Sequence, residues 1–140
     1  MRHFLILIIL STFFFLYSQC GSVPTARVFE GEDFDFSLDH AEKAIGIKRK
    51  LSGEGASEGW EYFYFCERTK GENKKKCGKW IDEKGDNIKI GSKVTLKENT
   101  AIISSISEKE SGRYVAIKED PKDERYGLVL NVRTTVKPKN

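Results

Sequence analysis

The sequence contains few of the residues from which enzymes build active sites. Only two of its 140 residues are histidines, and one of these, His3, lies in an N-terminal apolar segment. A Ser-His-Asp or Cys-His device could therefore be centred only on His40, and its neighbours Asp39 and Glu42 are equally typical of a solvated loop. Since there is no glycine-rich phosphate loop either, the sequence predicts that the protein is not an enzyme and has no catalytic residue.

Cysteine is also scarce, and this excludes two further kinds of site. The chain has three cysteines, and no two of them have the Cys-x-x-Cys spacing of thiol exchange. A zinc site would need more ligands than Cys66, Cys77 and the distant His40 can supply. We therefore expect no metal and no cofactor. The sequence has no Asn-x-Ser/Thr acceptor, so we expect no N-linked glycan on any face.

Long apolar runs are absent except at the N-terminus. Residues 4–16 are almost wholly apolar, follow Arg2, and give way to residues 18–21, Ser-Gln-Cys-Gly. This pattern predicts a signal peptide over residues 1–20, and the run is shorter than the ~20 residues of a membrane span. The sequence around Cys20 is also similar to a bacterial lipoprotein box, but it lacks the small residue before the cysteine.

Removal of the signal peptide would leave a chain of the length of one domain. We expect residues 21–140 to form a single domain with short flexible ends, secreted to the extracellular space. Because the signal region carries one basic residue, Arg2, and no acidic one, its removal lowers the formal net charge by one unit from +3. So small a charge gives no reason to expect nucleic-acid binding, and we expect no stable membrane insertion.

Secretion would affect whether the remaining cysteines form a disulfide. Cleavage after Cys20 would leave Cys66 and Cys77, an even pair for which a disulfide is the default in an oxidising compartment. A pair of free thiols is the weaker alternative. Cleavage one residue earlier would leave Cys20 unpaired near a mobile terminus, so the cleavage site and the fate of this cysteine stay open.

Apolar residues of the mature chain recur with period two, and Gly, Asn, Asp and Lys clusters interrupt them at short intervals. This pattern predicts antiparallel strands and an all-β protein. Over residues 31–38, for example, Phe34, Phe36 and Leu38 share one face of a strand. No helical stripe is longer than two turns, and residues 128–132 are typical of the last strand.

Residues 110–116 have the sequence Glu-Ser-Gly-Arg-Tyr-Val-Ala. They resemble the acidic-Ser-Gly-x-Tyr-x-Cys signature of an immunoglobulin domain, with Ala116 in place of the final cysteine. Residues 31–38 resemble strand B of that family, with Leu38 in place of the first core cysteine, and the apolar residues 101, 103 and 106 fall where strand E has them. The resemblance implies an immunoglobulin-like antiparallel β-sandwich of variable or intermediate type, without the usual disulfide between the sheets.

The resemblance also implies roles for individual residues. Leu38 would face Ala116 and replace the missing disulfide by apolar contact. Burial of a leucine side chain contributes roughly 1.5–3 kcal/mol, comparable with the ~2–4 kcal/mol of a disulfide. Tyr114 occupies the position of the tyrosine corner, whose hydroxyl ties strand F to the preceding corner. In variable-type relatives a basic residue pairs with the acid of this loop, so we expect Lys93 to meet Glu110.

We assign the β-prone residues 60–65 to strand C of the family. Their alternation puts Phe63 and Phe65 on the apolar face, so one of these, rather than the nearby tryptophan, would replace the buried tryptophan of the family. Cys66 would then point away from the core and form a disulfide with Cys77. That disulfide would clamp a hairpin across a lysine-rich connection.

Two surfaces are candidates for binding. The first is the outward face of the sheet that contains strand C, where Tyr62 and Tyr64, joined by Trp80, would form an aromatic patch for a protein partner. Tyrosine and tryptophan are favoured interface anchors because they bury a large area with few rotatable bonds. The alternative is that these aromatics pack under the 66–77 hairpin or under residues 81–90.

The second surface, the lysine cluster, consists of Lys74, Lys75, Lys76 and Lys79. Short basic runs attract sulfated polysaccharide or anionic lipid, although more often they are solvated loops. The preferred hypothesis is a secreted immunoglobulin-like protein that binds another extracellular or cell-surface protein in recognition, adhesion or signalling. The alternative is a polyanion-binding extracellular module that binds glycosaminoglycan through the lysine cluster.

Overall fold

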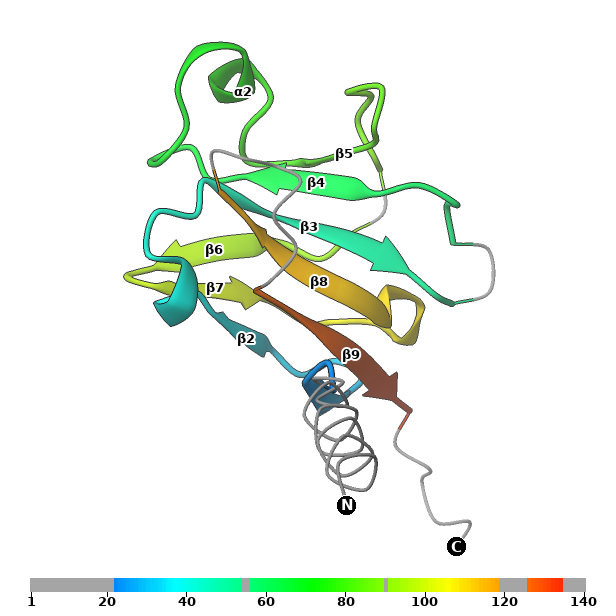
Figure 1. The fold of residues 1–140 in the computed structure, drawn as a ribbon. Coiled ribbons are helices and arrows are strands. Elements are labelled where there is room, and N and C mark those ends of the chain that lie inside the picture. Colours follow the sequence, from blue (N-terminus) through cyan, green and yellow to red (C-terminus); the bar gives the residue numbers. More distant parts are fainter. Residues whose placement is uncertain (1–21, 54–55, 90, 119–125, 135–140) are drawn as a thin grey trace, which may run out of the picture.

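The computed structural model describes residues 22–53, 56–89, 91–118 and 126–134 (Figure 1). The predicted signal peptide lies outside these residues. A six-stranded sheet has the spatial order β1-β9-β8-β3-β4-β5, with the bounds Thr25–Phe29, Gly127–Arg133, Gly112–Ile117, Gly46–Leu51, Glu61–Tyr64 and Trp80–Ile81. A three-stranded sheet has the order β2-β7-β6, with the bounds Phe34–Ser37, Thr100–Ile103 and Val94–Lys97.

The strand order is that of an immunoglobulin-like β-sandwich. The last two strands, β8 and β9, pair antiparallel, and β3, β4 and β5 extend the sheet beyond β8. This corresponds to strands G, F and C followed by C′ and C″, the addition that distinguishes variable-type domains. The other sheet, β2-β7-β6, corresponds to strands B, E and D. The predicted all-β immunoglobulin-like sandwich is therefore confirmed.

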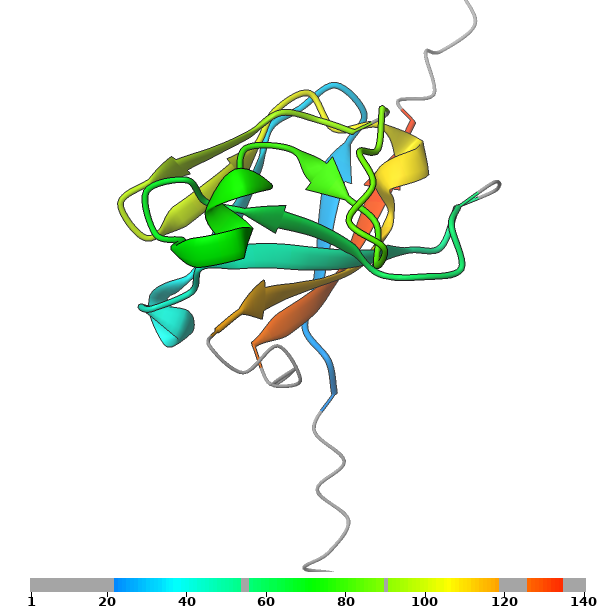
Figure 2. The same cartoon turned by 90° about the horizontal axis from the view of Figure 1, so that it is seen from above.

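The two sheets form the two layers of the sandwich. Seen from above, β3, β8 and β9 lie in one layer and β6 and β7 in the other (Figure 2). Alternate residues of each strand turn into the space between the layers, since side chains alternate across a strand. On β2 the burial alternates strictly, with Phe34 and Phe36 buried and Asp35 and Ser37 exposed. This is the alternation that the sequence shows over residues 31–38.

The assignment of strand C to residues 60–65 was wrong. β3 lies between β8 and β4, so β3 is strand C and β4 is strand C′. The reason is that β3 contains Lys48, Arg49 and Lys50 in succession, so it shows no apolar face in the sequence. Its inward positions are held by Ile47 and Arg49, both fully buried. The family's buried tryptophan would belong to β3. Phe63 and Phe65 are buried, but Phe63 lies on the neighbouring strand β4 and Phe65 directly after it, so neither takes the place of that tryptophan.

Side chains from both sheets form one hydrophobic core. Leu38 is 1% exposed and Ala116 is 2% exposed, and both belong to one cluster of buried residues. The two positions where the family has its cysteines are thus occupied by buried hydrocarbon. Phe34 from the three-stranded sheet packs edge-on against Tyr114, with 6.1 Å between ring centroids.

In the described ranges, helical structure is confined to short segments. The 3-10 helices η1 (Asp39–Ala41) and η2 (Glu108–Glu110) precede β3 and β8, and α2 (Gly71–Lys75) lies in the connection between β4 and β5. The sequence did not indicate α2, because this helix buries none of its residues and so has no apolar stripe. Within the described residues, no helix has the length and apolar character that crossing a bilayer requires.

Candidate functional site

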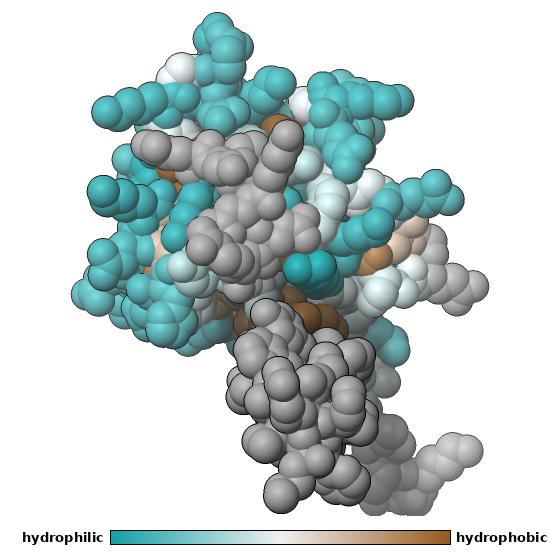
Figure 3. All heavy atoms as spheres, viewed as in Figure 1, coloured by the Kyte–Doolittle hydropathy of each residue, from teal (hydrophilic) through white to brown (hydrophobic). Residues whose placement is uncertain are grey.

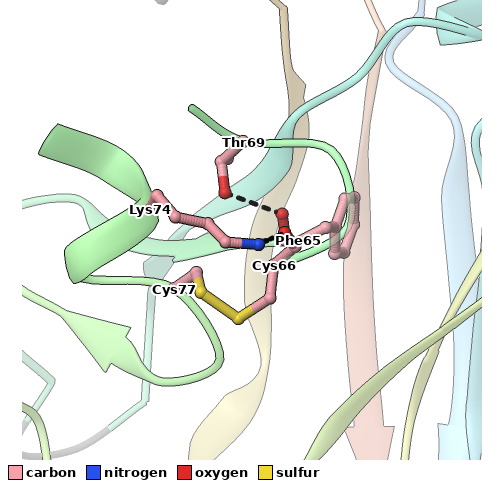
Figure 4. Close-up of a disulfide and its surroundings, with 5 residues drawn as sticks. All are labelled: Phe65, Cys66, Thr69, Lys74 and Cys77. Atoms are coloured by element: carbon pink, nitrogen blue, oxygen red, sulfur yellow. Dashed lines mark hydrogen bonds between the residues drawn. A yellow bond between two sulfur atoms is a disulfide. The ribbon is translucent and has the colours of Figure 1, made fainter. Parts of the chain in front are cut away.

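The connection between β4 and β5 is held by a disulfide (Figure 4). Cys66 follows the end of β4 and Cys77 precedes β5, with 5.1 Å between their Cα atoms. The ammonium of Lys74, on α2, donates a hydrogen bond to the carbonyl oxygen of Cys66, and the Thr69 hydroxyl donates to the carbonyl oxygen of Phe65 at 2.9 Å. The predicted disulfide is thus present, and it closes a connection that contains α2. In the chain-entropy model, closing a loop of this size stabilises by roughly 3 kcal/mol or slightly less.

The tyrosine pair, Tyr62 and Tyr64, lies on the outward face of β4. Both side chains are half-buried, and their rings stack with 6.4 Å between centroids and 12° between planes. Burial raises the pKa of Tyr64 above its usual value. On the opposite face of the same strand Phe63 is buried in the core, as is Phe65 directly after the strand, so β4 carries aromatic rings on both sides. The pair therefore stands on a strand that the core and the disulfide hold in place.

Trp80 does not join the tyrosine pair, and that prediction was wrong. Because Trp80 is the register partner of Phe63, it lies on the inward face of the sheet, where it is 3% exposed. Its ring packs edge-on against Phe63 at 5.5 Å between centroids, and its Nε1 donates a hydrogen bond to the carbonyl oxygen of Ser92 at 3.1 Å. Trp80 therefore belongs to the hydrophobic core and not to the outward face.

Arg49 lies beneath Trp80 and is the centre of a buried ionic network. The guanidinium carbon is 3.8 Å from the centroid of the Trp80 ring. Nε donates to Oε2 of Glu61 at 2.7 Å, and Nη1 donates to Oε1 of Glu110 at 2.6 Å. All three charged side chains are at least nine-tenths buried. Two buried carboxylates therefore surround one buried guanidinium, and each ion has a partner of opposite charge.

Glu110 receives further hydrogen bonds. The backbone N–H and the hydroxyl of Ser92 donate to it at 2.9 and 2.6 Å, and the backbone N–H of Ser107 donates at 3.0 Å. Burial alone would raise the pKa of Glu110, but the hydrogen bonds from Ser92, Ser107 and Arg49 outweigh burial and hold the pKa below its usual value. The expected partner, Lys93, is exposed and does not take this role; Arg49 does, and that prediction was wrong.

Tyr114 ends the network on the side of β8. Its hydroxyl donates to the carbonyl oxygen of Glu110 at 2.8 Å, which is the hydrogen bond of a tyrosine corner. Burial raises the pKa of Tyr114 to about 12.

Gly112, two residues before Tyr114, has a φ of 157°, and a Cβ there would lie 2.3 Å from the carbonyl oxygen of Lys50. Only glycine therefore allows β8 to approach β3 so closely at this point.

The lysine cluster is only partly available to a ligand. Lys74 donates to the carbonyl oxygen of Cys66, and Lys75 forms an exposed ion pair with Glu72 at 2.7 Å. Lys79 is exposed, and Lys76 is half-buried. The four ammonium groups therefore do not present one uniform cationic surface.

His40 lies in η1 and is exposed. The nearby Ser37 hydroxyl donates to the carboxylate of Asp39 at 2.8 Å. In the part of the chain that the structure describes, no group of three or more His, Cys, Asp or Glu side chains is placed to hold a metal ion.

Comparisons with known proteins give matches only among solved structures. No protein-family model and no curated protein matches the chain. One similar structure is the extracellular fragment of novel immune-type receptor 11 from Ictalurus punctatus, including its stalk region. It is 12% identical with a TM-score of 0.46, and the alignment covers 84% of this chain and 90% of that one.

Two further similar structures are also extracellular parts of proteins. The extracellular domain of the voltage-gated sodium channel beta4 subunit is 12% identical with a TM-score of 0.41, over 87% of this chain and 95% of that one. The extracellular portion of mouse CD200RLa is 11% identical with a TM-score of 0.41, over 81% of this chain and 56% of that one. The identities and scores are low, so the fold assignment rests on the strand order described above.

Proposed function

We propose that the protein is secreted and binds another extracellular protein through the outward face of its six-stranded sheet, in recognition, adhesion or signalling. The observation that carries this proposal is the tyrosine pair, Tyr62 and Tyr64, stacked and half-buried on that face. The proposal includes removal of residues 1–20 as a signal peptide and one folded domain over residues 21–140.

The setting of the tyrosine pair suits a binding role. Interfaces gain affinity when their anchors are ordered before the partner arrives, because less side-chain freedom is then lost on binding. Here each ring is restrained by the other, and the strand beneath them is fixed by the buried Phe63 and by the disulfide that begins at Cys66. The buried charges of Arg49 and its partners, by contrast, are occupied with one another in the interior.

The test is a capture of extracellular proteins on the purified mature chain, followed by direct binding measurements with the partner identified. Changing Tyr62→Ala together with Tyr64→Ala should weaken the specific interaction by at least about tenfold, the loss typical of an interface anchor. The matched control is Thr95→Ala with Ile102→Ala, which removes side chains from the outward face of the other sheet.

Thermal unfolding should show that both variants remain folded. A specific partner whose affinity is the same for the tyrosine variant and the wild type would exclude the tyrosine pair as the site. The competing polyanion hypothesis predicts strong retention on a heparin column that is lost when Lys74, Lys75 and Lys76 are replaced. The contacts of Lys74 and Lys75 within the chain give that hypothesis less support.

A further inference from the structure

The outward face of the six-stranded sheet carries charge of one sign. The residues that alternate with the core residues of these strands include five cations. Arg27 on β1, Arg133 on β9 and Lys50 on β3 are exposed, Arg113 on β8 is half-buried, and Lys48 on β3 is buried. The only carboxylate in the six strands is Glu61, which points inward to Arg49. No outward position of these strands is therefore acidic.

This segregation does not follow from the overall charge. The formal net charge of the whole chain is only +3, and the acidic residues are nearly as numerous as the basic ones. On the outward face of the three-stranded sheet one cation, Lys97, is matched by one carboxylate, Asp35. The basic character thus belongs to one face, where it produces a local positive potential.

The markedly exposed apolar residues lie on or next to the two strands at one edge of the same sheet. Three large apolar residues are markedly exposed in the described part of the chain, and these are Val23 at 47%, Phe29 at 49% and Val129 at 37%. Val23 precedes β1, Phe29 ends β1, and Val129 lies on the adjacent strand β9. Among the coloured atoms on the face seen in Figure 3, hydrophilic residues predominate.

The strand register brings these apolar groups and the arginines together. β1 and β9 pair in parallel, with Phe29 opposite Arg133 and Arg27 opposite Asn131. Paired strands are about 4.8 Å apart, and alternate residues of one strand share a face. Phe29 therefore lies beside Arg133 and one step along the face from Arg27, and both arginines are exposed. We call Arg27, Phe29, Val129 and Arg133 the edge patch.

We propose that the edge patch binds an acidic protein surface that also supplies an apolar side chain to contact Phe29. This inference rests on the proposed function, since it gives the chemistry of the partner. Arginine and aromatic residues are enriched at the centres of protein interfaces, and arginine binds carboxylates through two parallel hydrogen bonds. A sulfated polysaccharide would use the same cations but would gain little from exposed Phe29 and Val129, so these two residues favour a protein.

The test uses a displayed library of random 12-residue peptides, selected on the mature chain. The selected peptides should be enriched in Asp and Glu together with aromatic or large aliphatic residues. Binding of the best peptide should weaken as salt is raised, because the attraction is between exposed charges. Changing Arg27→Glu with Arg133→Glu should lower its affinity by at least about tenfold, and Phe29→Ser should lower it several-fold.

The matched control is Lys93→Glu with Lys97→Glu, which makes the same change in charge at two exposed lysines, one at the end of β6 and one just before that strand. This control should leave peptide binding unchanged, and all variants should unfold at similar temperatures. Selected peptides without acidic enrichment, or equal losses in the control and the arginine variant, would overturn the inference. So would heparin oligosaccharide binding that needs both arginines but is unaffected by Phe29→Ser, since that result would identify a polysaccharide site.

Failure of this inference can be told apart from failure of the proposed function. An extracellular partner that is lost with the tyrosine variant but retained by Arg27→Glu with Arg133→Glu would leave the proposed function standing and exclude the edge patch. A selected acidic peptide that needs the edge patch, with no effect of the tyrosine variant on any captured protein, would support the edge patch and exclude the tyrosine pair.

Discussion

Two adjacent rows of inward side chains on the six-stranded sheet differ completely in chemistry. The register aligns Phe63, Ile47 and Ala116 in one row across β4, β3 and β8, which we call the apolar row. The next row in the same three strands, the ionic row, consists of Glu61, Arg49 and Tyr114. Both rows are buried between the same two sheets.

The two rows should therefore respond differently to substitution. A side chain in the apolar row contributes through the area it buries and the space it fills, so losses there should follow the volume removed. In the ionic row each charge is tolerated only because its partners are present, so the loss of one leaves the others buried without compensation. A buried row of this sandwich can thus consist of hydrocarbon or of a complete set of charges, but not of part of that set.

The largest effect should come from breaking the ionic row. Arg49→Met keeps much of the side-chain volume but leaves Glu61 and Glu110 buried without their cation. We expect the free energy of unfolding to fall by about 3–5 kcal/mol, measured by urea denaturation at neutral pH. Adding Glu61→Gln to this variant should restore part of the loss, because one unpaired charge is then removed. A loss below about 1 kcal/mol for Arg49→Met would show that the network contributes little.

A somewhat smaller loss of stability is expected when a side chain of the hydrophobic core is shortened. Leu38 is 1% exposed and belongs to the same core cluster as the apolar row. Leu38→Ala should lower the free energy of unfolding by about 3 kcal/mol, within the range of buried leucine truncations. Adding Ile47→Val should lower it further by about 1 kcal/mol rather than restore it. Restoration by this second change would contradict the contrast between the rows.

The contrast between the rows also explains what could be predicted from sequence. The alternation over residues 31–38 and the motif over residues 110–116 are local patterns, and they were sufficient to indicate strands B and F and the family fold. Strand C could not be recognised, because Arg49 lies within a run of three basic residues. Its burial depends on Glu61 and Glu110, which are 12 and 61 positions away.

Long connections limited the prediction of the candidate site in the same way. Trp80 shares a face with Phe63 only because β5 pairs with β4 in one register, and the fifteen residues 65–79 separate the two strands. No local pattern specifies that register. The basic outward face was hidden for a related reason, since its five cations come from four strands that are distant in sequence. The tyrosine pair, by contrast, lies within a single strand and was found from its alternation.

Lowering the pH should reduce the stability contributed by the ionic row but not that of the apolar row, and it changes no side-chain volume. The pKa of Glu110 in the folded protein is lower than its ordinary value of 4.5, so folding favours the ionised carboxylate. The stability that Glu110 contributes is therefore present above about pH 4.5 and is lost as pH falls through the lower folded-state pKa. Urea denaturation from pH 7 to pH 3 should show a steeper loss for the wild type than for Glu110→Gln. Leu38→Ala should retain the slope of the wild type, and equal slopes for the wild type and Glu110→Gln would contradict this assignment.

The smallest effect should come from the hydroxyl that joins the ionic row to the 3-10 turn before β8. Tyr114→Phe keeps the ring that packs against Phe34 and removes only the hydrogen bond to the carbonyl oxygen of Glu110. We expect a loss of about 1 kcal/mol, typical of one neutral hydrogen bond, measured as the shift of the urea midpoint at constant slope. In the Arg49→Met background the same change should cost a different amount, because Tyr114 and Arg49 belong to one network. Equal costs in the two backgrounds would show that the tyrosine corner acts independently of the buried charges.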